Sequence, residues 1–379
     1  MKKIMTVYGT RPEAIKVAPI IKALEASDKF ESIPVVTGQH REMLDQVNEL
    51  FDIKPVRDLN IMSKNQTLNG IVAKVIAGID EIYAEFEPDA VIVQGDTSTV
   101  MGAAVAAFNR QIPVVHVEAG LRSGDINSPF PEEANRKLTS QITKLHLAPT
   151  AESKANLLRE NLPEADIVVT GNSVIDALLE AVDRPVEFSD PKLGEALGAD
   201  KPVILVTTHR RENLGSSMEN IGRAVATLAQ KYPHYQVVLP AHKNPLVRET
   251  VLPHLEGLEN VLVTEPVAYA EFTHLLKASR IVLTDSGGVQ EEAPSLGKPV
   301  LVMRENTERP EAVKAGTVRL IGTDYDRIVD EVSALVEDEQ HFARMANAVN
   351  PYGDGKAAER TVAALEELFG VGKRIKNFS

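Results

Sequence analysis

The sequence predicts an α/β protein built from two doubly wound parallel-sheet domains in tandem. The first observation is a series of short β-branched runs that alternate with helix-length amphipathic stretches along all 379 residues. The second is that these runs are continuously apolar, which is typical of strands buried on both faces of a parallel sheet. The third is chain length, because about 100–200 residues per domain is usual.

The first half contains six predicted strands, at Ile4–Tyr8, Ile33–Thr37, Ala90–Gln94, Pro113–Val117, Leu145–Pro149 and Ile167–Thr170. Amphipathic stretches such as Glu13–Leu24 and Leu68–Phe86 lie between them and are predicted helices. A strand followed by a helix, repeated several times, predicts a doubly wound sheet.

The second half repeats this plan with strands at Val203–Thr208, Gln236–Pro240, Val261–Thr264, Ile281–Thr284, Val300–Met303 and Val318–Ile321. A helical connector, Gly171–Pro185, precedes a polar, proline-containing stretch. A last helix, about Ala357–Phe369, follows all the strands and is free to pack on either half. We place the domains at 1–170 and 171–361, with a terminal segment at 362–379.

Composition excludes several functional classes. The formal net charge is −13 with no basic run, so we expect neither a nucleic-acid nor an anionic-membrane partner. The absence of Cys excludes disulfides, thiolate metal sites and cysteine nucleophiles. The longest uncharged stretch, Thr97–Asn109, is shorter than the about 18 residues that span a bilayer, and no signal peptide is visible, so we expect a cytoplasmic protein. No metal-site spacing occurs, and the segment Gly353–Ala358, which formally fits the dinucleotide-binding pattern, follows no predicted strand, so we expect no nicotinamide and no other cofactor.

Polar residues follow the strands of the first half. Arg11 and Lys16 flank a predicted helix N-terminus, where they either bind an anion or remain solvated around a helix cap. Asp96 and Glu118 each come just beyond an apolar run, and Glu132 lies in a predicted loop stiffened by prolines. Carboxylates partly desolvated in a cleft can act as general acid or base, although any single one could instead be an ion-pair partner.

A glycine turn and cations follow the strands of the second half. Ser286, Gly287 and Gly288 come after a strand and before a predicted helix that carries Glu292, which suits a phosphate cradle with a ribose acceptor. The turn is neither a P-loop nor a dinucleotide-binding fingerprint. Cations at the ends of three other strands indicate a multiply charged anion such as a diphosphate; they are His209, Arg210, Arg211, His242, Lys243, Arg304 and Arg309.

Several long motifs, in order, resemble the bacterial non-hydrolysing UDP-N-acetylglucosamine 2-epimerases. They are Gly9–Lys16, Gln39–Gln46, Gly95–Thr97, His116–Arg122, Pro131–Glu133, His209–Glu212 and Thr284–Pro299. The resemblance implies a GT-B fold with an interdomain cleft and a C-terminal helix that packs back on the first domain. It implies interconversion of UDP-N-acetylglucosamine and UDP-N-acetylmannosamine, with UDP as the third ligand, in cell-surface polysaccharide synthesis, and often a homodimer.

The resemblance also implies roles for individual residues. Asp96, Glu118 and Glu132 would transfer protons, assisted by Lys16 and His209. The substrate-binding positions would be Arg11, Lys16, Asp96, Glu118, His209, Val267, Phe272, Ser286, Gly287, Gly288, Glu292 and Arg309. Positions that match an allosteric substrate site are Gln39, Glu132, Arg210 and His242, whereas Glu42 and Asn65 depart from the regulated pattern.

Three other functions remain open at this point. A GT-B glycosyltransferase would use the same nucleotide half with an acceptor, and a hydrolysing epimerase would release free N-acetylmannosamine. A periplasmic sugar-binding protein would need an export signal and has no use for opposed cations and carboxylates.

Overall fold

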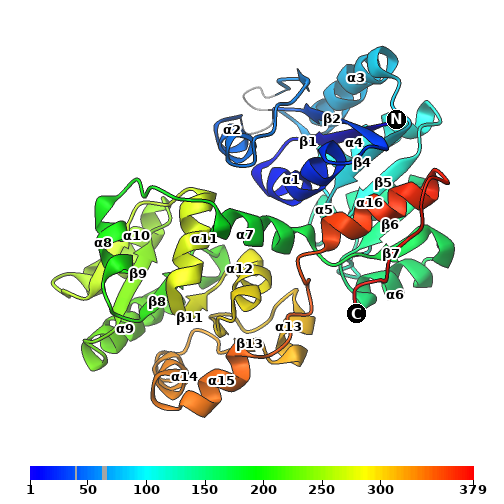
Figure 1. The fold of residues 1–379 in the computed structure, drawn as a ribbon. Coiled ribbons are helices and arrows are strands. Elements are labelled where there is room, and N and C mark those ends of the chain that lie inside the picture. The colour runs from blue at the N-terminus through cyan, green and yellow to red at the C-terminus, as the bar shows by residue number, and fades with distance from the viewer. Residues whose placement is uncertain (39–40, 62–65) are drawn as a thin grey trace. The chain divides into compact units, whose positions relative to one another are not determined.

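The computed structural model describes residues 1–38, 41–61 and 66–379, except for the side chains of residues 41 and 42. The chain forms two compact units, one of Met1–Leu179 with Tyr352–Ser379 and one of Glu180–Pro351. Figure 1 shows both units, each with a central sheet and helices around it. Within the described residues, no helix combines the length and apolarity needed to span a bilayer.

The first unit contains a seven-stranded parallel sheet in the order β3-β2-β1-β4-β5-β6-β7. Its strands are β1 Lys2–Tyr8, β2 Phe30–Val36, β3 Arg57–Asp58, β4 Ala90–Gln94, β5 Val114–Val117, β6 Leu145–Ala148 and β7 Ile167–Val169. Its helices are α1 Arg11–Glu25, α2 Arg41–Leu50, α3 Leu68–Phe86, α4 Ser98–Asn109, α5 Glu132–Ile142, α6 Ala151–Arg159, η1 Glu164–Asp166, α7 Ser173–Asp183, which runs past the end of the unit, and α16 Ala357–Leu368.

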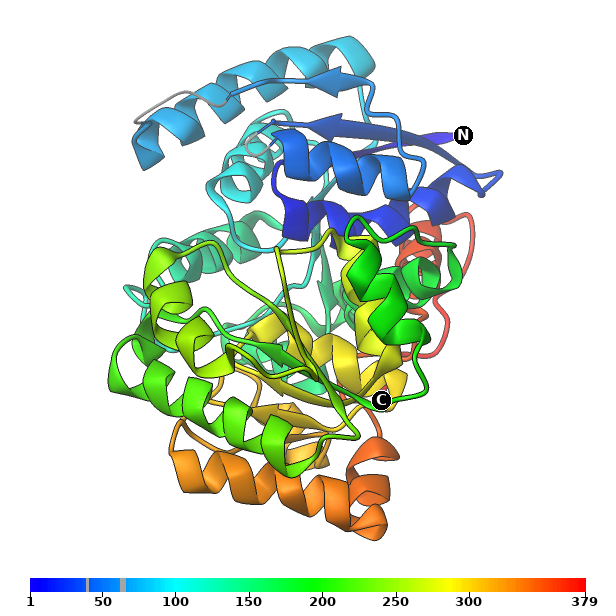
Figure 2. The same cartoon turned by 90° about the vertical axis from the view of Figure 1, so that its left-hand side faces the viewer.

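The second unit contains a six-stranded parallel sheet in the order β10-β9-β8-β11-β12-β13. Its strands are β8 Val203–Thr207, β9 Gln236–Pro240, β10 Val261–Thr264, β11 Ser279–Thr284, β12 Val300–Val302 and β13 Val318–Leu320. Its helices are α8 Pro191–Gly198, η2 Arg211–Asn213, α9 Ser216–Lys231, α10 Pro245–Leu255, α11 Tyr269–Ala278, α12 Gly287–Glu292, η3 Ala293–Leu296, α13 Pro310–Ala315, α14 Tyr325–Glu337 and α15 Glu339–Ala346. Figure 2 shows α9 and α14 running side by side beneath this sheet.

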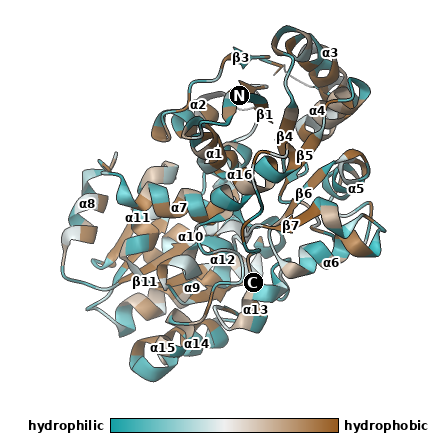
Figure 3. Cartoon of the chain, turned by 45° about the vertical axis from the view of Figure 1, so that its right-hand side comes forward, coloured by the Kyte–Doolittle hydropathy of each residue, from teal (hydrophilic) through white to brown (hydrophobic). Residues whose placement is uncertain are grey.

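Both sheets are covered on two faces, as the continuously apolar runs predict. In β4, Val91 and Val93 pack into one apolar cluster with α3 and α4, while Ala90 and Ile92 pack into another with α1 and α16. Figure 3 shows the strands as apolar segments inside each unit. The prediction of two doubly wound parallel sheets is therefore confirmed.

The strand order also locates the sites. In each unit the order reverses between the first and fourth strands, which are β1 and β4 in one sheet and β8 and β11 in the other. Ligands of doubly wound sheets bind beyond the carboxyl ends of the strands at this switch point. Ligand-binding residues are therefore expected in the loops after β1 and β4 of one unit and after β8 and β11 of the other.

Two local predictions are wrong, and two elements were not predicted. Glu132 is the first residue of α5 and does not lie in a loop. α12 begins at Gly287 itself, so both glycines lie in its first turn. The polar stretch after α7 contains a helix, α8, because Asp190 caps it and Pro191 suits its first turn. The strand β3 was not predicted, since it is only two residues long.

The units divide at Leu179/Glu180 and Pro351/Tyr352, whereas the sequence placed boundaries at 170/171 and 361/362. The difference has a physical cause in Asp176 of α7. Its carboxylate accepts hydrogen bonds from the N–H groups of Ala357 (3.2 Å) and Ala358 (2.9 Å) at the start of α16. Both helices therefore belong to the first unit, and α16 packs against α1 there.

Asp176 should make stability depend on pH. Burial raises the pKa of Asp176 to about 6, so the folded state binds this proton more tightly than the unfolded chain. Its contribution to stability is therefore present at low pH and is lost as the pH rises from about 4 to about 6, on the order of 2–3 kcal/mol. Denaturant unfolding of wild type and Asp176→Asn at pH 4 and pH 7 should show a smaller pH difference in the variant. Equal differences would contradict the prediction.

Candidate active-site halves in the two units

The loop after β1 is bound to the loop after β4 by one buried glutamate. Thr10 and Glu13 form a capping box at the start of α1, with Thr10 N–H donating to Glu13 Oε2 at 2.9 Å. Gly9 N–H donates to the same oxygen at 2.6 Å, and Thr97 Oγ1 donates to Glu13 Oε1. Burial raises the pKa of Glu13. The segment that carries Arg11 and the segment that carries Asp96 are thus fixed together.

Glu118 lies just beyond β5 and is held by three side chains. Lys16 Nζ lies 2.6 Å from Glu118 Oε1, to which Asn172 Nδ2 also donates at 3.2 Å, and Gln94 Nε2 donates to Oε2. The side chain of Glu118 is only 8% exposed. Its φ of 63° lies in the left-handed region, which costs a residue with a side chain about 1–3 kcal/mol. Strain of this kind concentrates at functional sites.

Asp96 is held by α5 on one side and by the sheet on the other. Arg136 Nη2 lies 2.7 Å from its carboxylate, and Asn135 Nδ2 donates to its carbonyl at 2.8 Å. Nε2 of the buried His116 lies 2.7 Å from the carbonyl of Gly95, and burial lowers the pKa of His116 to about 4. Gly95, which directly precedes Asp96, is therefore hydrogen-bonded to a neutral imidazole.

Glu132 begins the same helix that holds Asp96. Its Oε2 atom is buried and has no hydrogen-bond partner among the described residues. Asp96 follows β4 and Glu118 follows β5, where it pairs with Lys16, while Glu132 starts the helix whose Arg136 holds Asp96; we call these three acids the carboxylate cluster. Arg136 was not predicted as a site residue, because its only signal in the sequence is its position one turn after Glu132 and Glu133 on a helix.

In the second unit, cations surround the first turn of α12. A methyl group built on Gly287 would lie 3.5 Å from Arg210 Nη2 and 3.8 Å from Arg309 Nη2. The ring of His209 stacks on that of His242 at a centroid distance of 5.5 Å. We call these four basic residues the cationic cluster. Its composition and the glycine between the guanidinium groups fit an anion with several oxygens.

Burial lowers the pKa of His209, and the positive groups of His242 and Arg210 add to that effect. Asp285 acts in the opposite direction, since its carboxylate oxygen lies 3.4 Å from His209 Nδ1. Asp285 lies within the Thr284–Pro299 motif, but no role was predicted for it.

Arg304 is not part of the cationic cluster, which corrects the prediction that it helps to bind the anion. It is buried, with Nε 2.6 Å from Glu212 and Nη1 2.8 Å from Glu308. Its hydrogen bonds hold the pKa of Glu308 down at about 2. Arg304 therefore fixes the loop before Arg309, because its partner Glu308 lies in that loop and its partner Glu212 lies in η2 of the same unit.

The remaining positions that are predicted to bind the nucleotide lie on or next to α11 and α12. Tyr269 OH donates to Glu292 Oε1 at 2.9 Å, and both residues are buried. Phe272 is one turn further along α11, and Val267 precedes the helix; both are half-buried. Ser286 is the N-cap of α12 but makes no side-chain capping bond. Gln39 lies outside the described residues, as do Asn65 and the side chain of Glu42.

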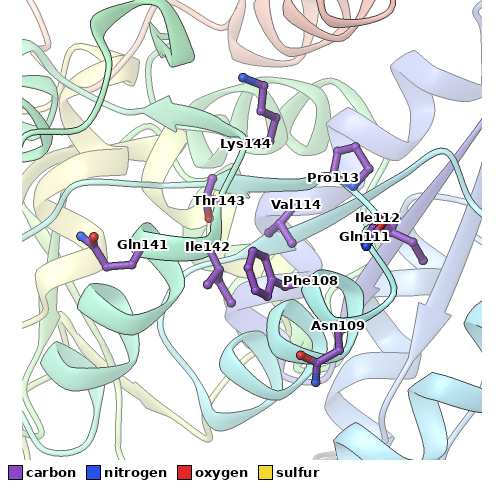
Figure 4. A pocket seen from close by; sticks show the side chains of 10 residues that line it. All are labelled: Phe108, Asn109, Gln111, Ile112, Pro113, Val114, Gln141, Ile142, Thr143 and Lys144. Atoms are coloured by element: carbon purple, nitrogen blue, oxygen red, sulfur yellow. The ribbon is translucent and has the colours of Figure 1, made fainter.

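A pocket of about 640 Å³ lies elsewhere in the first unit. Figure 4 shows its lining, which comes from the end of α4, the start of β5, the end of α5 and the start of β6. This is the amino edge of the sheet, opposite to the carboxylate cluster. No group of three or more His, Cys, Asp or Glu side chains in the described part of the chain is placed to hold a metal ion.

Comparison with known proteins identifies the family of the chain. The family model described as UDP-N-acetylglucosamine 2-epimerase matches residues 22–366. A UDP-N-acetylglucosamine 2-epimerase of Salmonella typhimurium is 54% identical over 96% of this chain and 98% of its own. The crystal structure of the Neisseria meningitidis UDP-GlcNAc 2-epimerase bound to UDP-GlcNAc is similar, with a TM-score of 0.85, 47% identity and coverage of 96% of this chain and 100% of that one.

A glycosyltransferase structure shares the fold alone, at 15% identity and a TM-score of 0.64 over 96% of this chain and 98% of its own. The predicted GT-B type of fold, with two Rossmann-like parallel-sheet domains, is thereby confirmed. The predicted family is confirmed as well, since the family model and the relatives cover nearly the whole chain. The chain belongs to the UDP-N-acetylglucosamine 2-epimerase family.

Proposed function

We propose that this chain interconverts UDP-N-acetylglucosamine and UDP-N-acetylmannosamine without net hydrolysis. The observation that carries the proposal is the complementary chemistry of the two switch points. The first unit supplies desolvated carboxylates and Lys16, and the second supplies the cationic cluster around Gly287. Membership of the epimerase family supports the substrate.

The chemistry of the sugar selects an elimination route. The proton on C2 is not adjacent to a carbonyl, because C1 is an acetal carbon, so simple deprotonation is very unfavourable. A base instead removes the C2 proton while the C1–O bond breaks. The C–H electrons then form the C1=C2 bond of 2-acetamidoglucal, and UDP leaves with the C–O electrons. UDP adds back to C1 as C2 receives a proton on its other face.

This route requires two kinds of group. The carboxylate cluster provides acids and bases for the C2 proton, and such groups accelerate proton transfer about 10²–10⁴-fold. The cationic cluster, with Ser286 and the glycines of α12, stabilises the negative charge on the departing diphosphate. Lys16 and Arg11 add positive charge beside the sugar and the diphosphate. No hydride moves, so the reaction needs no nicotinamide.

The nucleoside would bind along the second unit. Glu292, oriented by Tyr269, accepts the ribose hydroxyls. The uracil packs on Phe272 and meets the backbone at Val267. Arg309 and Arg210 flank the diphosphate at Gly287.

Incubation with UDP-N-acetylglucosamine alone in D₂O tests the function. An epimerase of this type incorporates deuterium at C2 of both sugars and retains the nucleotide. A glycosyltransferase leaves C2 unlabelled without an acceptor, and a hydrolysing epimerase accumulates UDP and free N-acetylmannosamine. Either of these results would refute the proposal.

Activation by a second UDP-N-acetylglucosamine is a further part of the proposal. Glu132, Arg210 and His242 match the positions of such a site, as does Gln39. Glu42 and Asn65 weaken it, because an anion and a neutral amide replace groups that favour a diphosphate. A hyperbolic dependence of initial rate on substrate, with no activation, would contradict regulation.

The family resemblance also supports a cytoplasmic homodimer whose product feeds cell-surface polysaccharide synthesis. Light scattering coupled to size-exclusion chromatography tests the dimer, since a monomeric mass at micromolar concentration would exclude it.

A further inference from the structure

Asp285 is a fully buried carboxylate that collects hydrogen bonds from the loop after β8. His209 N–H donates to its two oxygens at 3.1 and 3.0 Å, and Arg210 N–H donates to Oδ2 at 3.0 Å. Thr208 Oγ1 (2.9 Å) and Asn213 Nδ2 (3.1 Å) also donate to Oδ2. Three of these partners, the two backbone N–H groups and Asn213 Nδ2, can only donate, so the site suits the acceptor oxygens of an acid better than the NH₂ group of an amide.

These hydrogen bonds fix His209 and Arg210, which are two of the four residues of the cationic cluster. The backbone of His209 and Arg210 is held directly by the carboxylate, and Arg210 Nε donates to the carbonyl of Asp285 at 3.2 Å. The side chain of Arg210 therefore lies beside Gly287, while its backbone N–H, its Nε and the N–H of His209 are all hydrogen-bonded to Asp285.

Asp285 also faces the ring of His209. The Nδ1 atom lies 3.4 Å from Asp285 Oδ1, which is ion-pair range and long for a hydrogen bond. A carboxylate at this place favours a proton on Nδ1, so the neutral ring carries its lone pair on Nε2. The other groups that face His209 are the ring of His242, stacked on it, and Arg210, and positive charge on either one opposes a positive His209 ring.

We propose that Asp285 is a positioning residue for the diphosphate: it anchors the His209–Arg210 segment and keeps the proton of neutral His209 on Nδ1, with Nε2 directed to the ligand. The ligand assignment rests on the proposed function. The tautomer and the anchoring are features of the ligand-free protein and do not depend on which ligand binds. When an anion binds, the carboxylate on one side and the phosphate on the other stabilise the doubly protonated ring.

Nitrogen NMR of the wild-type protein tests the tautomer without any substitution at Asp285. Long-range ¹H–¹⁵N spectra at high pH, with His209 assigned by its loss in His209→Gln, should show a protonated Nδ1. Addition of UDP should raise the pKa of this ring. A protonated Nε2 in the free protein would overturn the proposal.

Asp285→Asn tests the anchoring, with Asp176→Asn as the matched loss of a buried carboxylate in the other unit. Asp285→Asn should weaken UDP binding at least about tenfold by calorimetry, because its amide directs N–H groups at donors. It should also lower the pKa of His209. Asp176→Asn should leave the UDP dissociation constant within about twofold of wild type and the pKa of His209 unchanged.

A folded Asp285→Asn protein with unchanged UDP affinity and unchanged His209 pKa would overturn the inference, and if that variant does not fold, the wild-type tautomer decides. None of these measurements uses turnover. A protein that shows the tautomer and the affinity loss but no C2 exchange in D₂O would refute the proposed reaction and leave the inference standing.

Discussion

Replacing Glu118 by Gln should lower kcat for epimerisation by about 10²–10⁴-fold, the usual contribution of a general acid or base. The substitution removes the charge that Lys16 neutralises at 2.6 Å and leaves the shape of the side chain intact. Exchange of the C2 proton with D₂O should fall in parallel with epimerisation, because both need the same proton transfer.

Two controls separate this effect from a change of fold. UDP affinity should stay within about threefold of wild type, since the proposed nucleoside contacts and the cationic cluster proposed to bind the diphosphate are on the second unit. Glu25→Gln, which removes an exposed glutamate that pairs with Lys22 on α1, should leave kcat unchanged. A folded Glu118→Gln protein that retains more than a third of the wild-type kcat would contradict the assigned role.

Residue patterns were sufficient to predict the sheets because parallel strands are buried on both faces. The strands β4, β9 and β10 match the predicted runs at both ends, although β10 is an edge strand, and most others differ by one to three residues. The edge strand β3 carries no such signal, since Arg57 and Asp58 are exposed and pair with β2 alone. The apolar pattern that burial imposes, and not β-strand propensity alone, made the strands predictable from the sequence.

The site was predicted less completely because charge alone does not reveal a partner. Arg304 follows a strand end as Arg309 does, yet its guanidinium is buried between Glu212 and Glu308. These acids lie 92 residues before it and four after it, and only the fold brings them together. Asp285 was overlooked for the same reason, as its donors come from a loop more than 70 residues earlier.

The glycine turn after β11 provides the second large effect: Gly287→Val should weaken UDP binding about 10–100-fold while the protein stays folded. Gly287 does not have a left-handed backbone, so the substitution introduces no backbone strain. A Cβ atom there would meet the guanidinium groups of Arg210 and Arg309 at 3.5–3.9 Å, an ordinary contact distance without ligand.

With ligand, the added methyl groups occupy the space that a phosphate needs between the two arginines. Loss of one charge-assisted contact, worth about 1.5–3 kcal/mol, accounts for the expected loss of affinity. Gly198→Val is the matched control, because Gly198 ends α8 and an added Cβ atom there would meet no atom within 4 Å, and it should leave UDP binding unchanged. Calorimetric titration with UDP decides between the alternatives. If Gly287→Val binds UDP as wild type does, the phosphate does not lie against Gly287, and the diphosphate assignment of the cationic cluster fails with it.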